Sequence, residues 1–157
     1  MIKASMTSGD WVAEHIRTYL ENGKAAHLID MSAVGGREGP TPSLLLRTVG
    51  RKSGRTQLVP LIYGRHGDEV ILIASKGGAP QHPAWYLNMT SAAEVEYKLE
   101  DQCHRALWRE LEGEEREQVW RETAELYPPY DDYQAATTRH IPVLALRPVA
   151  EIPSLSA

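Results

Sequence analysis

Phenylalanine is absent from this 157-residue sequence, and cysteine occurs once, as Cys103. A single cysteine excludes an internal disulfide, and no spacing of cysteine and histidine resembles a zinc site, so we expect no bound metal. No apolar run approaches the roughly 18 residues that a membrane-spanning helix requires. The N-terminal stretch also lacks the apolar core and cleavage site of a signal peptide, so we expect a cytoplasmic protein.

Acidic residues are missing from one long part of a chain whose net charge is −4. No Asp or Glu lies between Glu38 and Asp68, and the Lys and Arg residues of that window are Arg47, Arg51, Lys52, Arg55 and Arg65. A cationic segment in an acidic protein favours a compact anionic ligand over nucleic acid, because the acidic remainder repels a long polyanion. A solvated basic loop would show the same pattern, so charge alone leaves both interpretations open.

The usual signatures of hydrolases and metalloproteases are also absent. The sequence contains neither a G-x-S-x-G nor an H-E-x-x-H motif. Lys52-Ser53 resembles the end of a phosphate-binding loop, but Arg51 stands where that motif has glycine. We therefore expect no catalysis by a protein nucleophile or by a metal ion.

Apolar periodicity and turn residues predict a single domain over residues 1–157, with an N-terminal helix and loop over 1–40 and a barrel core over 43–147. Residues 8–21 have helical spacing, with Ser8 or Asp10 as the N-cap, and residues 23–42 are expected to form a loop. The later elements are three consecutive antiparallel strands over 43–75, a short helix over 82–89, a hairpin over 93–111, helices over 113–127 and 128–138, and a closing strand over 141–149. Pro60 marks an edge strand or a bulge. Five or six antiparallel strands with several short helices indicate a mainly β fold with α elements, a closed or partly closed β-barrel.

Two glycine-containing turns combine cations with accessible backbone. The turn "GRKSGR", residues 50–55, offers main-chain N–H groups and charged donors that suit a phosphate or a carboxylate. The turn "SKGG", residues 75–78, puts Lys76 after a buried strand and lets a flat ligand approach the main chain. Ordinary hairpin turns decorated with charge are the simpler alternative for both.

Aromatic residues follow these turns. Trp85 and Tyr86 lie on the predicted short helix, where packing against the barrel is the simpler explanation for Trp85. Tyr127, Tyr130 and Tyr133 are spaced by three around a double proline. Tyrosine in place of phenylalanine indicates hydroxyls that find a partner, or a partly wet pocket. Together with the cationic turns, these residues predict a site for a flat ring with an acidic tail, which describes a flavin-like cofactor.

The same residues resemble a known family. The segment "LLLRTVGRKSGRTQLVPLIYGRHGDEVILIASKGGAPQHPAWYLNM", followed by "YPPYDDYQAATTRHIPVLAL", is similar to the deazaflavin-dependent nitroreductases over residues 43 to 147. The resemblance implies a split β-barrel that binds coenzyme F420, a deazaflavin with a phosphodiester and an oligoglutamate tail. It implies an F420H2-dependent oxidoreductase that transfers a hydride to a small organic acceptor, an activated C=C bond, a quinone or a nitro compound.

The resemblance also implies roles for individual residues. The cofactor's phosphate and acidic tail would contact Arg51, Lys52 and Ser53. Its ring and side chain would contact three further groups, which are Gln57, Leu58, Val59, Pro60, Leu61 and Ile62; Ile73, Ala74, Ser75 and Lys76; and Ala84, Trp85, Tyr86, Leu87 and Asn88. The substrate wall and catalytic residues would be Tyr127, Tyr130 and Tyr133, with the Tyr130 hydroxyl polarising or protonating the acceptor.

Two features of the sequence limit this assignment. Ile62 stands where the nitroreductases have a tyrosine, and Tyr63 faces the other side of a strand, so the resemblance leaves the reduction of bulky nitroimidazoles open. The N-terminal helix has a mixed polar face with Glu14, Arg17 and Glu21, so it is expected to lie across the barrel and not on lipid. The alternatives are a split-barrel protein for FMN, biliverdin or haem, with FMN disfavoured by the strongly basic loop, and a carrier of F420 without turnover. We expect a monomer or a homodimer.

Overall fold

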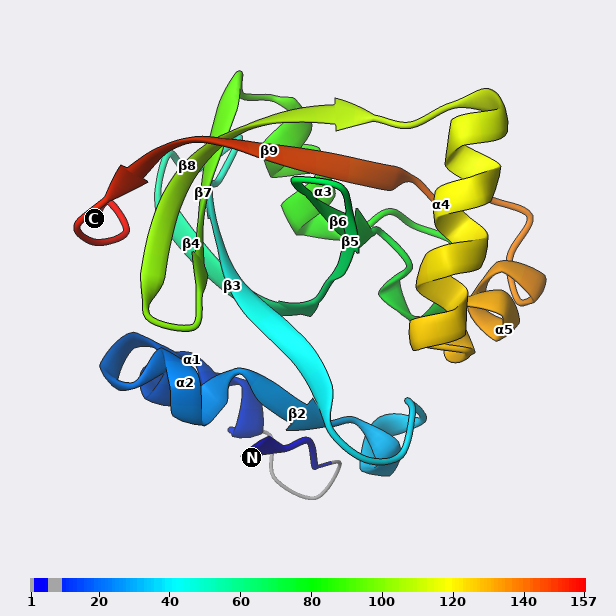
Figure 1. Cartoon of the computed structure of the whole chain (residues 1–157), viewed down its shortest axis with the longest axis horizontal. Coiled ribbons are helices and arrows are strands. Elements are labelled where there is room, and N and C mark those ends of the chain that lie inside the picture. Colours follow the sequence, from blue (N-terminus) through cyan, green and yellow to red (C-terminus); the bar gives the residue numbers. More distant parts are fainter. Residues whose placement is uncertain (1, 6–9) are drawn as a thin grey trace.

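The computed structural model describes residues 2–5 and 10–157. Over this part of the chain, nine strands form one curled sheet with the helices around it (Figure 1). The strands are β1 (Ile2–Lys3), β2 (Leu28–Asp30), β3 (Thr41–Val49), β4 (Thr56–Ile62), β5 (Gly64–His66), β6 (Glu69–Ile73), β7 (Glu94–Leu99), β8 (Gln102–Glu110) and β9 (Val143–Ile152). Their order is β1-β2-β3-β7-β8-β9-β6-β5, and β4 pairs with β3 outside this path. The prediction of a mainly β barrel is confirmed, whereas five or six strands was too few.

Seven helical segments accompany the sheet in the described residues. They are α1 (Trp11–Glu21), α2 (Gly23–Ala26), η1 (Ser32–Val34), η2 (Lys76–Gly78), α3 (Ala84–Thr90), α4 (Gly113–Leu126) and α5 (Pro129–Ala135). In Figure 1, α1 and α2 lie below the sheet and α4 and α5 lie at its right-hand end. No helix in the described ranges is long and apolar enough to cross a membrane.

The sheet is split between two hairpins. β3 and β4 pair from Ser43↔Ile62 to Val49↔Thr56, and β5 pairs with β6 through the Gly67-Asp68 turn. The predicted run of three consecutive paired strands is therefore wrong, because the chain leaves the first hairpin at Tyr63 and begins the second. Within the described strands β4 pairs with β3 alone, which confirms Pro60 on an edge strand.

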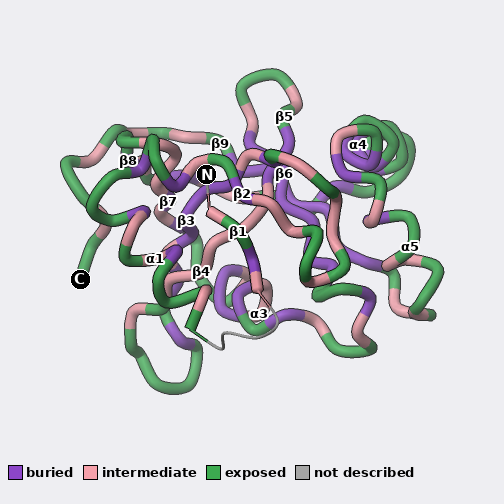
Figure 2. The backbone as a smooth tube through the Cα atoms, turned by 90° about the horizontal axis from the view of Figure 1, so that it is seen from below, coloured by how far each residue is buried: buried purple, intermediate pink, exposed green. Residues whose placement is uncertain are grey.

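Strand β6 and the first part of β9, residues 143–146, are buried on both faces. Val70 and Leu72 pack into the core inside the curled sheet, whereas Ile71 and Ile73 pack into a second core under α4 and α5. Because successive side chains of a strand point to opposite faces, a continuous apolar run is required here. Figure 2 shows buried segments in β6 and along one side of α4.

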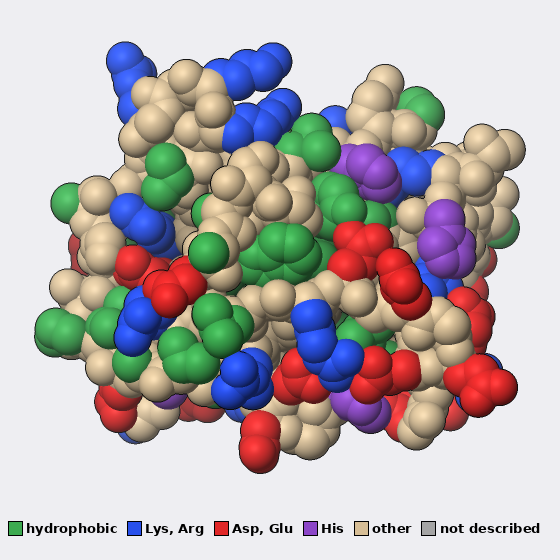
Figure 3. Space-filling model, turned by 90° about the horizontal axis from the view of Figure 1, so that it is seen from above, with side chains coloured by type: hydrophobic (Ala, Val, Ile, Leu, Met, Phe, Trp, Pro, Cys, Tyr) green, Lys and Arg blue, Asp and Glu red, His purple; other side chains and the backbone are tan. Residues whose placement is uncertain are grey.

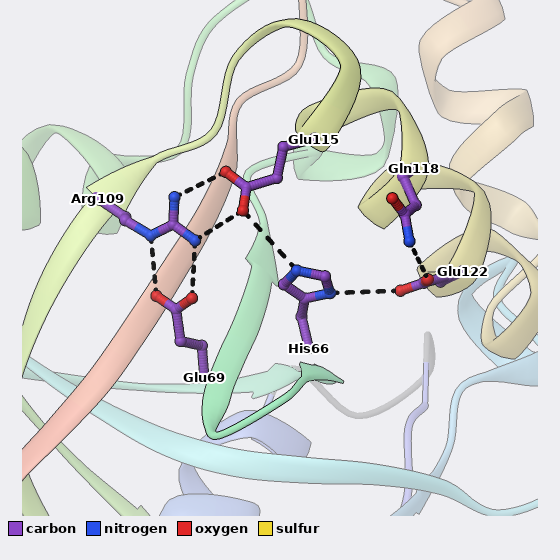
Figure 4. A network of polar contacts seen from close by, with 6 residues as sticks. All are labelled: His66, Glu69, Arg109, Glu115, Gln118 and Glu122. Atoms are coloured by element: carbon purple, nitrogen blue, oxygen red, sulfur yellow. Dashed lines mark hydrogen bonds and ion pairs between the residues drawn. The ribbon is translucent and has the colours of Figure 1, made fainter.

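Helix α4 is also held by a network of charged side chains (Figure 4). The Arg109 guanidinium of β8 pairs with Glu69 of β6 and Glu115 of α4, each at 2.7 Å. The His66 ring of β5 lies between Glu115 and Glu122, at 3.8 and 3.6 Å. The hydrogen bonds from Arg109 lower the pKa of Glu69. Such exposed pairs are individually weak, so they orient α4 while the apolar face beneath it supplies the stability.

The N-terminal segment differs from the prediction. The expected loop over 23–42 contains α2, β2 and η1, and β1 pairs with β2 in parallel. Asp10 occupies the N-cap position of α1 without a side-chain capping bond, and Ser8 lies outside the described residues. These short elements depend on tertiary contacts, which a local pattern does not reveal. A Cβ at Gly23, for example, would lie 1.7 Å from the Glu100 carbonyl oxygen.

Helix α1 lies against the barrel, as predicted. Its Tyr19 is fully buried, packs with Leu45 and donates a hydrogen bond to the Ser43 carbonyl at 2.8 Å. The same hydroxyl accepts a bond from the Glu100 backbone N–H at 3.0 Å. One hydroxyl therefore joins α1 to β3 and to the turn between β7 and β8.

Replacement Tyr19→Phe removes both hydrogen bonds and keeps the ring. We expect the free energy of unfolding to fall by about 1–3 kcal/mol, because buried polar groups lose their partner. Urea denaturation measures this change. The exposed Val12→Ala on the same helix is the control and should change stability by less than about 0.5 kcal/mol. Equal effects of the two substitutions would contradict the role of the hydroxyl.

Candidate active site

A cavity of about 410 Å³ opens where the split in the barrel meets the N-terminal segment. One side is formed by β4, β6, η2, α3 and the segment around α5, and the other by residues before β3. Its lining residues are Trp11, His15, Ile29, Met31, Val34, Ser43, Pro60, Leu61, Ile62, Ile73, Ser75, Lys76, Gly77, Pro83, Trp85, Tyr127, Tyr130 and Tyr133. Apolar and aromatic side chains dominate this wall, with few polar groups among them, as is typical of small-molecule sites.

Many of the site residues predicted from the sequence come together in this wall. They are Pro60, Leu61, Ile62, Ile73, Ser75, Lys76, Trp85, Tyr127, Tyr130 and Tyr133. Strands β4 and β6, the turn η2, helix α3 and the segment around α5 contribute them, and the split between β4 and β6 places them around one space. The structure thus brings seven of the fifteen predicted ring-binding residues and the three tyrosines into a common cavity.

Other predicted residues lie outside the cavity wall. They are Arg51, Lys52, Ser53, Gln57, Leu58, Val59, Ala74, Ala84, Tyr86, Leu87 and Asn88. Leu58 packs against the N-terminal cluster, and Ala74 is fully buried. Tyr86 donates a hydrogen bond to Glu110, and burial together with this carboxylate raises the pKa of Tyr86 to about 12. Contacts of these residues with a cofactor stay predictions.

The cationic turn between β3 and β4 projects into solvent. Its Gly54 has a φ of +70°, and the turn is closed by backbone bonds from Gly50 to Arg55 and from Gly54 to Gly50. Asn88 of α3 accepts bonds from the Arg51 backbone N–H at 3.1 Å and from its guanidinium at 3.0 Å. Asn88 therefore holds the cationic turn against α3 through these two hydrogen bonds.

Lys52 and Arg55 of the same turn are exposed, and no carboxylate in the described part of the chain pairs with either. Figure 3 shows Lys and Arg side chains projecting together at one corner of the molecule. Unpaired cations on a rigid turn are suited to an anionic group of a ligand.

The turn after β6 is fixed by Arg139, a residue to which the sequence analysis gave no role. Its guanidinium donates to the carbonyls of Ala74, Ser75 and Ala79 at 2.8–3.1 Å, and to His82 Nδ1 at 3.0 Å. Burial lowers the pKa of Arg139, and burial followed by the nearby guanidinium lowers that of His82. A forked cation thus holds η2 and the start of α3 in one arrangement.

Within that turn, Lys76 has a φ of +47°, in the left-handed region that few residues other than glycine adopt. Gly77 and Gly78 follow with φ of +62° and +84°. Such backbone persists only where its surroundings hold it, and here Arg139 does so. The result is a fixed turn with Lys76 and Gly77 in the cavity wall.

The three tyrosines form the wall around α5. The ring centroids of Tyr127 and Tyr130 are 4.8 Å apart, and those of Tyr130 and Tyr133 are 6.2 Å apart. Burial, followed by the two neighbouring tyrosines, raises the pKa of Tyr130 above its usual value. Its hydroxyl therefore keeps its proton at neutral pH and can donate a hydrogen bond into the cavity.

The strand alternation at the end of β4 agrees with the sequence-based interpretation. Ile62 lines the cavity, whereas Tyr63 is buried in the barrel core. The Tyr63 hydroxyl lies 2.8 Å from His27 Nε2, in contact with the N-terminal segment. Tyr63 therefore does not take the place in the wall that Ile62 occupies.

The N-terminal side of the wall was not predicted. Trp11, His15, Ile29, Met31 and Val34 belong to residues for which the sequence suggested a helix and a loop of unknown role. The segment fits closely against the tyrosine wall: a Cβ at Gly36 would lie 2.1 Å from the Tyr127 hydroxyl, and Arg37 donates to the Leu126 carbonyl at 3.2 Å. The helical spacing of Trp11 and His15 was the available signal.

A model of the F420H(2)-dependent quinone reductases matches residues 23–148 of the chain. The chain belongs to the F420H2-dependent quinone reductase family. It is 30% identical over 149 residues to an F420H2-dependent quinone reductase of Mycobacterium tuberculosis strain H37Rv, which covers 87% of this chain and 95% of the relative. This membership makes the protein an F420-dependent oxidoreductase.

Solved structures agree with the family. The F420-H2 dependent reductase FDR-A is 42% identical, with a TM-score of 0.62 over 68% of this chain and 94% of that one. A domain-swapped dimer is 37% identical, with a TM-score of 0.65 over 88% of this chain and 98% of that one. The resemblance to F420-dependent enzymes is thereby confirmed for the split-barrel fold, the enzyme class and the cofactor.

The residues present fit F420. The cofactor combines a flat ring with an anionic tail, and this quinone reductase homologue combines an apolar, aromatic cavity with a turn of unpaired cations. The Lys52 ammonium is a natural partner for the tail because no described carboxylate competes for it.

Substitution Lys52→Ala should weaken F420 binding by about 10- to 100-fold, the effect of losing one charge-assisted hydrogen bond. Quenching of tryptophan fluorescence measures the affinity, since Trp11 and Trp85 line the cavity. Lys24→Ala removes an exposed lysine of α2 and serves as the matched control, with unchanged affinity. Unchanged affinity of the Lys52 variant would remove the turn from the binding site.

Proposed function

We propose that this enzyme reduces a quinone-type acceptor with F420H2, and that the acceptor binds against Tyr127, Tyr130 and Tyr133. The observation that carries the proposal is the common cavity whose wall contains seven of the predicted ring-binding residues together with the three tyrosines. Ile62 and Ile73 pack in the same apolar cluster as the tyrosines, so a ring bound along these strands would lie next to the tyrosine wall. The naming of the family and of its Mycobacterium relative supports a quinone as the acceptor.

Each group of residues then has a separate task. Bound F420H2 supplies two electrons as a hydride, so the protein contributes position and electrostatics. Lys52 and Arg55 attract the anionic tail. Arg51 also attracts the tail, and its guanidinium is oriented by the hydrogen bond to Asn88. Leu61, Ile73 and Trp85 exclude water from the ring and align it with the acceptor.

Tyr130 is the residue that we assign to the acceptor's oxygen. Reduction of a quinone develops negative charge on oxygen, and a fixed hydrogen-bond donor stabilises that charge. The raised pKa of Tyr130 keeps the donor protonated. Tyr127 and Tyr133 pack against its ring and fix its orientation.

The proposal selects among the acceptors that the sequence left open. Ile62 offers an aliphatic surface where a nitroreductase would have a phenol, so the cavity suits a flat quinone ring better than a bulky nitroimidazole. FMN carries a phosphate without an oligoglutamate tail, so the exposed cations of the turn favour F420. Family membership also favours turnover over the alternative of a carrier.

An acceptor panel tests the function directly. F420H2 is supplied in excess and the acceptor is varied. The kcat/KM for naphthoquinones and benzoquinones should be at least about 10-fold higher than the kcat/KM for nitroimidazoles or cyclic enones. Formation of oxidised F420 is followed by its absorbance, with the same reactions without enzyme as controls. Faster reduction of nitroimidazoles, or no turnover of any quinone, would overturn the proposal.

Tyr130→Phe should lower kcat with the quinone by about 10- to 100-fold and leave F420 affinity nearly unchanged, because a donor to developing charge is lost while the ring remains. Burial raises the pKa of Tyr130 above the usual tyrosine pKa of about 10, so its hydroxyl stays protonated at that pH. The rate of the wild-type enzyme should therefore show no loss from Tyr130 ionisation near pH 10.

The matched control is Tyr63→Phe, which removes a buried hydroxyl that lies outside the cavity wall. Its kcat should remain near that of the wild type. If Tyr130→Phe lost cofactor affinity and kept its kcat, Tyr130 would be a binding residue instead. Circular dichroism of both variants separates these effects from misfolding.

A further inference from the structure

His15 is a fully buried histidine of α1 that lines the cavity and has no assigned role. Its ring lies between those of Trp11 and Tyr19, with centroids at 6.5 and 5.9 Å. Trp11 is half-buried and lines the same cavity. His15 therefore stands on the side of the cavity that the N-terminal segment contributes, away from the motif-bearing turns.

One ring nitrogen of His15 has a partner that fixes its protonation. Nε2 lies 3.0 Å from the Ala26 carbonyl oxygen, which can only accept a hydrogen bond. Nε2 must therefore carry a proton and donate it. Burial lowers the pKa of His15, which favours the neutral ring, and in this tautomer Nδ1 has a lone pair and no proton.

The other ring nitrogen lacks a partner. Within residues 2–5 and 10–157, nothing donates a hydrogen bond to His15 Nδ1, although the atom is shielded from water. Buried polar atoms are nearly always paired in folded proteins, and an unpaired one at a ligand cavity calls for a donor from the ligand. Neighbouring side chains do not satisfy it, since Ser43 donates to the carbonyls of Ala26 and His27.

We propose that His15 Nδ1 accepts a hydrogen bond from a phenolic hydroxyl of the molecule in the cavity, which makes His15 a specificity-determining residue. The proposal rests on the proposed function and adds the ligand class: an aromatic ring that bears O–H. A simple quinone offers only acceptor oxygens, whereas its hydroquinone and a hydroxyquinone offer this donor. Because Nδ1 is shielded in this structure, a ligand must displace part of the cavity wall to reach it.

The proposal predicts a preference that is independent of turnover. 1-Naphthol and 1-methoxynaphthalene have the same rings and differ in the hydroxyl donor, so the ratio of their affinities isolates that donor. Isothermal titration calorimetry on protein loaded with oxidised F420 should give about 10-fold tighter binding of 1-naphthol, the effect of a single hydrogen bond in a buried site.

The decisive variant is His15→Gln. The glutamine amide can reproduce the donation to Ala26 but has no acceptor in the place of Nδ1. We expect the affinity ratio to fall close to one, with 1-methoxynaphthalene bound as in the wild type. His27→Gln changes a histidine of the same segment that does not line the cavity, and its ratio should equal that of the wild type.

Two further measurements exclude a merely structural role. His15→Asn places an amide near the position of Nδ1 and should restore part of the preference for 1-naphthol. The ¹⁵N resonance of His15 Nδ1 should shift when 1-naphthol is added and stay in place with 1-methoxynaphthalene. A stability effect alone would produce neither result.

The outcomes separate this inference from the proposed function. A wild-type protein that binds both probes equally, or binds neither, overturns the role of His15, as does an unchanged ratio in His15→Gln. Quinone reduction in the acceptor panel would stand in each of those cases. If the ratio depends on His15 while no quinone is reduced, the hydroxyl site stands and the proposed reaction fails.

Discussion

The absent hydrogen-bond ladder between β4 and β6 is the constraint on which the rest of the molecule depends. β4 pairs with β3, and β6 pairs with β5 and β9, so these two strands do not join within the described sheet. Pro60 lies in β4 and has no N–H with which to extend a ladder. The barrel stays open there, and the cavity takes Leu61 and Ile62 from one lip and Ile73 from the other. The feature that prevents closure is therefore the feature that makes room for chemistry.

Around this opening, some polar side chains are held by internal hydrogen bonds and others have no partner in the described part of the chain. The Arg139 guanidinium donates hydrogen bonds to backbone carbonyls and to His82. These bonds fix the turn that carries Lys76. Asn88 likewise fixes the backbone of the cationic turn. The Lys52 ammonium on that turn has no carboxylate partner in the described part of the chain. Strand β6 and the start of β9, buried on both faces, anchor these turns in the two cores. Preorganisation of this kind suits an enzyme whose cofactor carries the reactive atom.

Much of this arrangement could be predicted from the sequence, and the reasons for the exceptions are physical. The strands β3, β4, β6, β7, β8 and β9 have strong local signals, such as the Gly67-Asp68 turn and the apolar run of β6, so these strands and the fold class were predicted correctly, whereas the short β5 was merged with β4. The cavity residues on those strands followed from the resemblance of their motifs. The elements α2, β2 and η1 were missed because each is three or four residues long and is stabilised by distant contacts, as the Gly23 approach to Glu100 shows. Arg139 and His15 were missed because their importance lies in unpaired or shared hydrogen bonds, which only the folded chain defines.

The close contact of Gly36 with the Tyr127 hydroxyl has a further consequence. The cavity wall comes from two parts of the chain, the barrel and the N-terminal segment, and their residues have different packing roles. The barrel contributes its fixed turns and its two cores, whereas Trp11, Met31 and Val34 line the cavity and belong to neither core. Substitutions at Trp11, Met31 and Val34 therefore change the cavity wall without touching either barrel core, whereas Tyr19 of the same segment is part of the scaffold. At these three positions the shape of the cavity can vary independently of the packing inside the barrel.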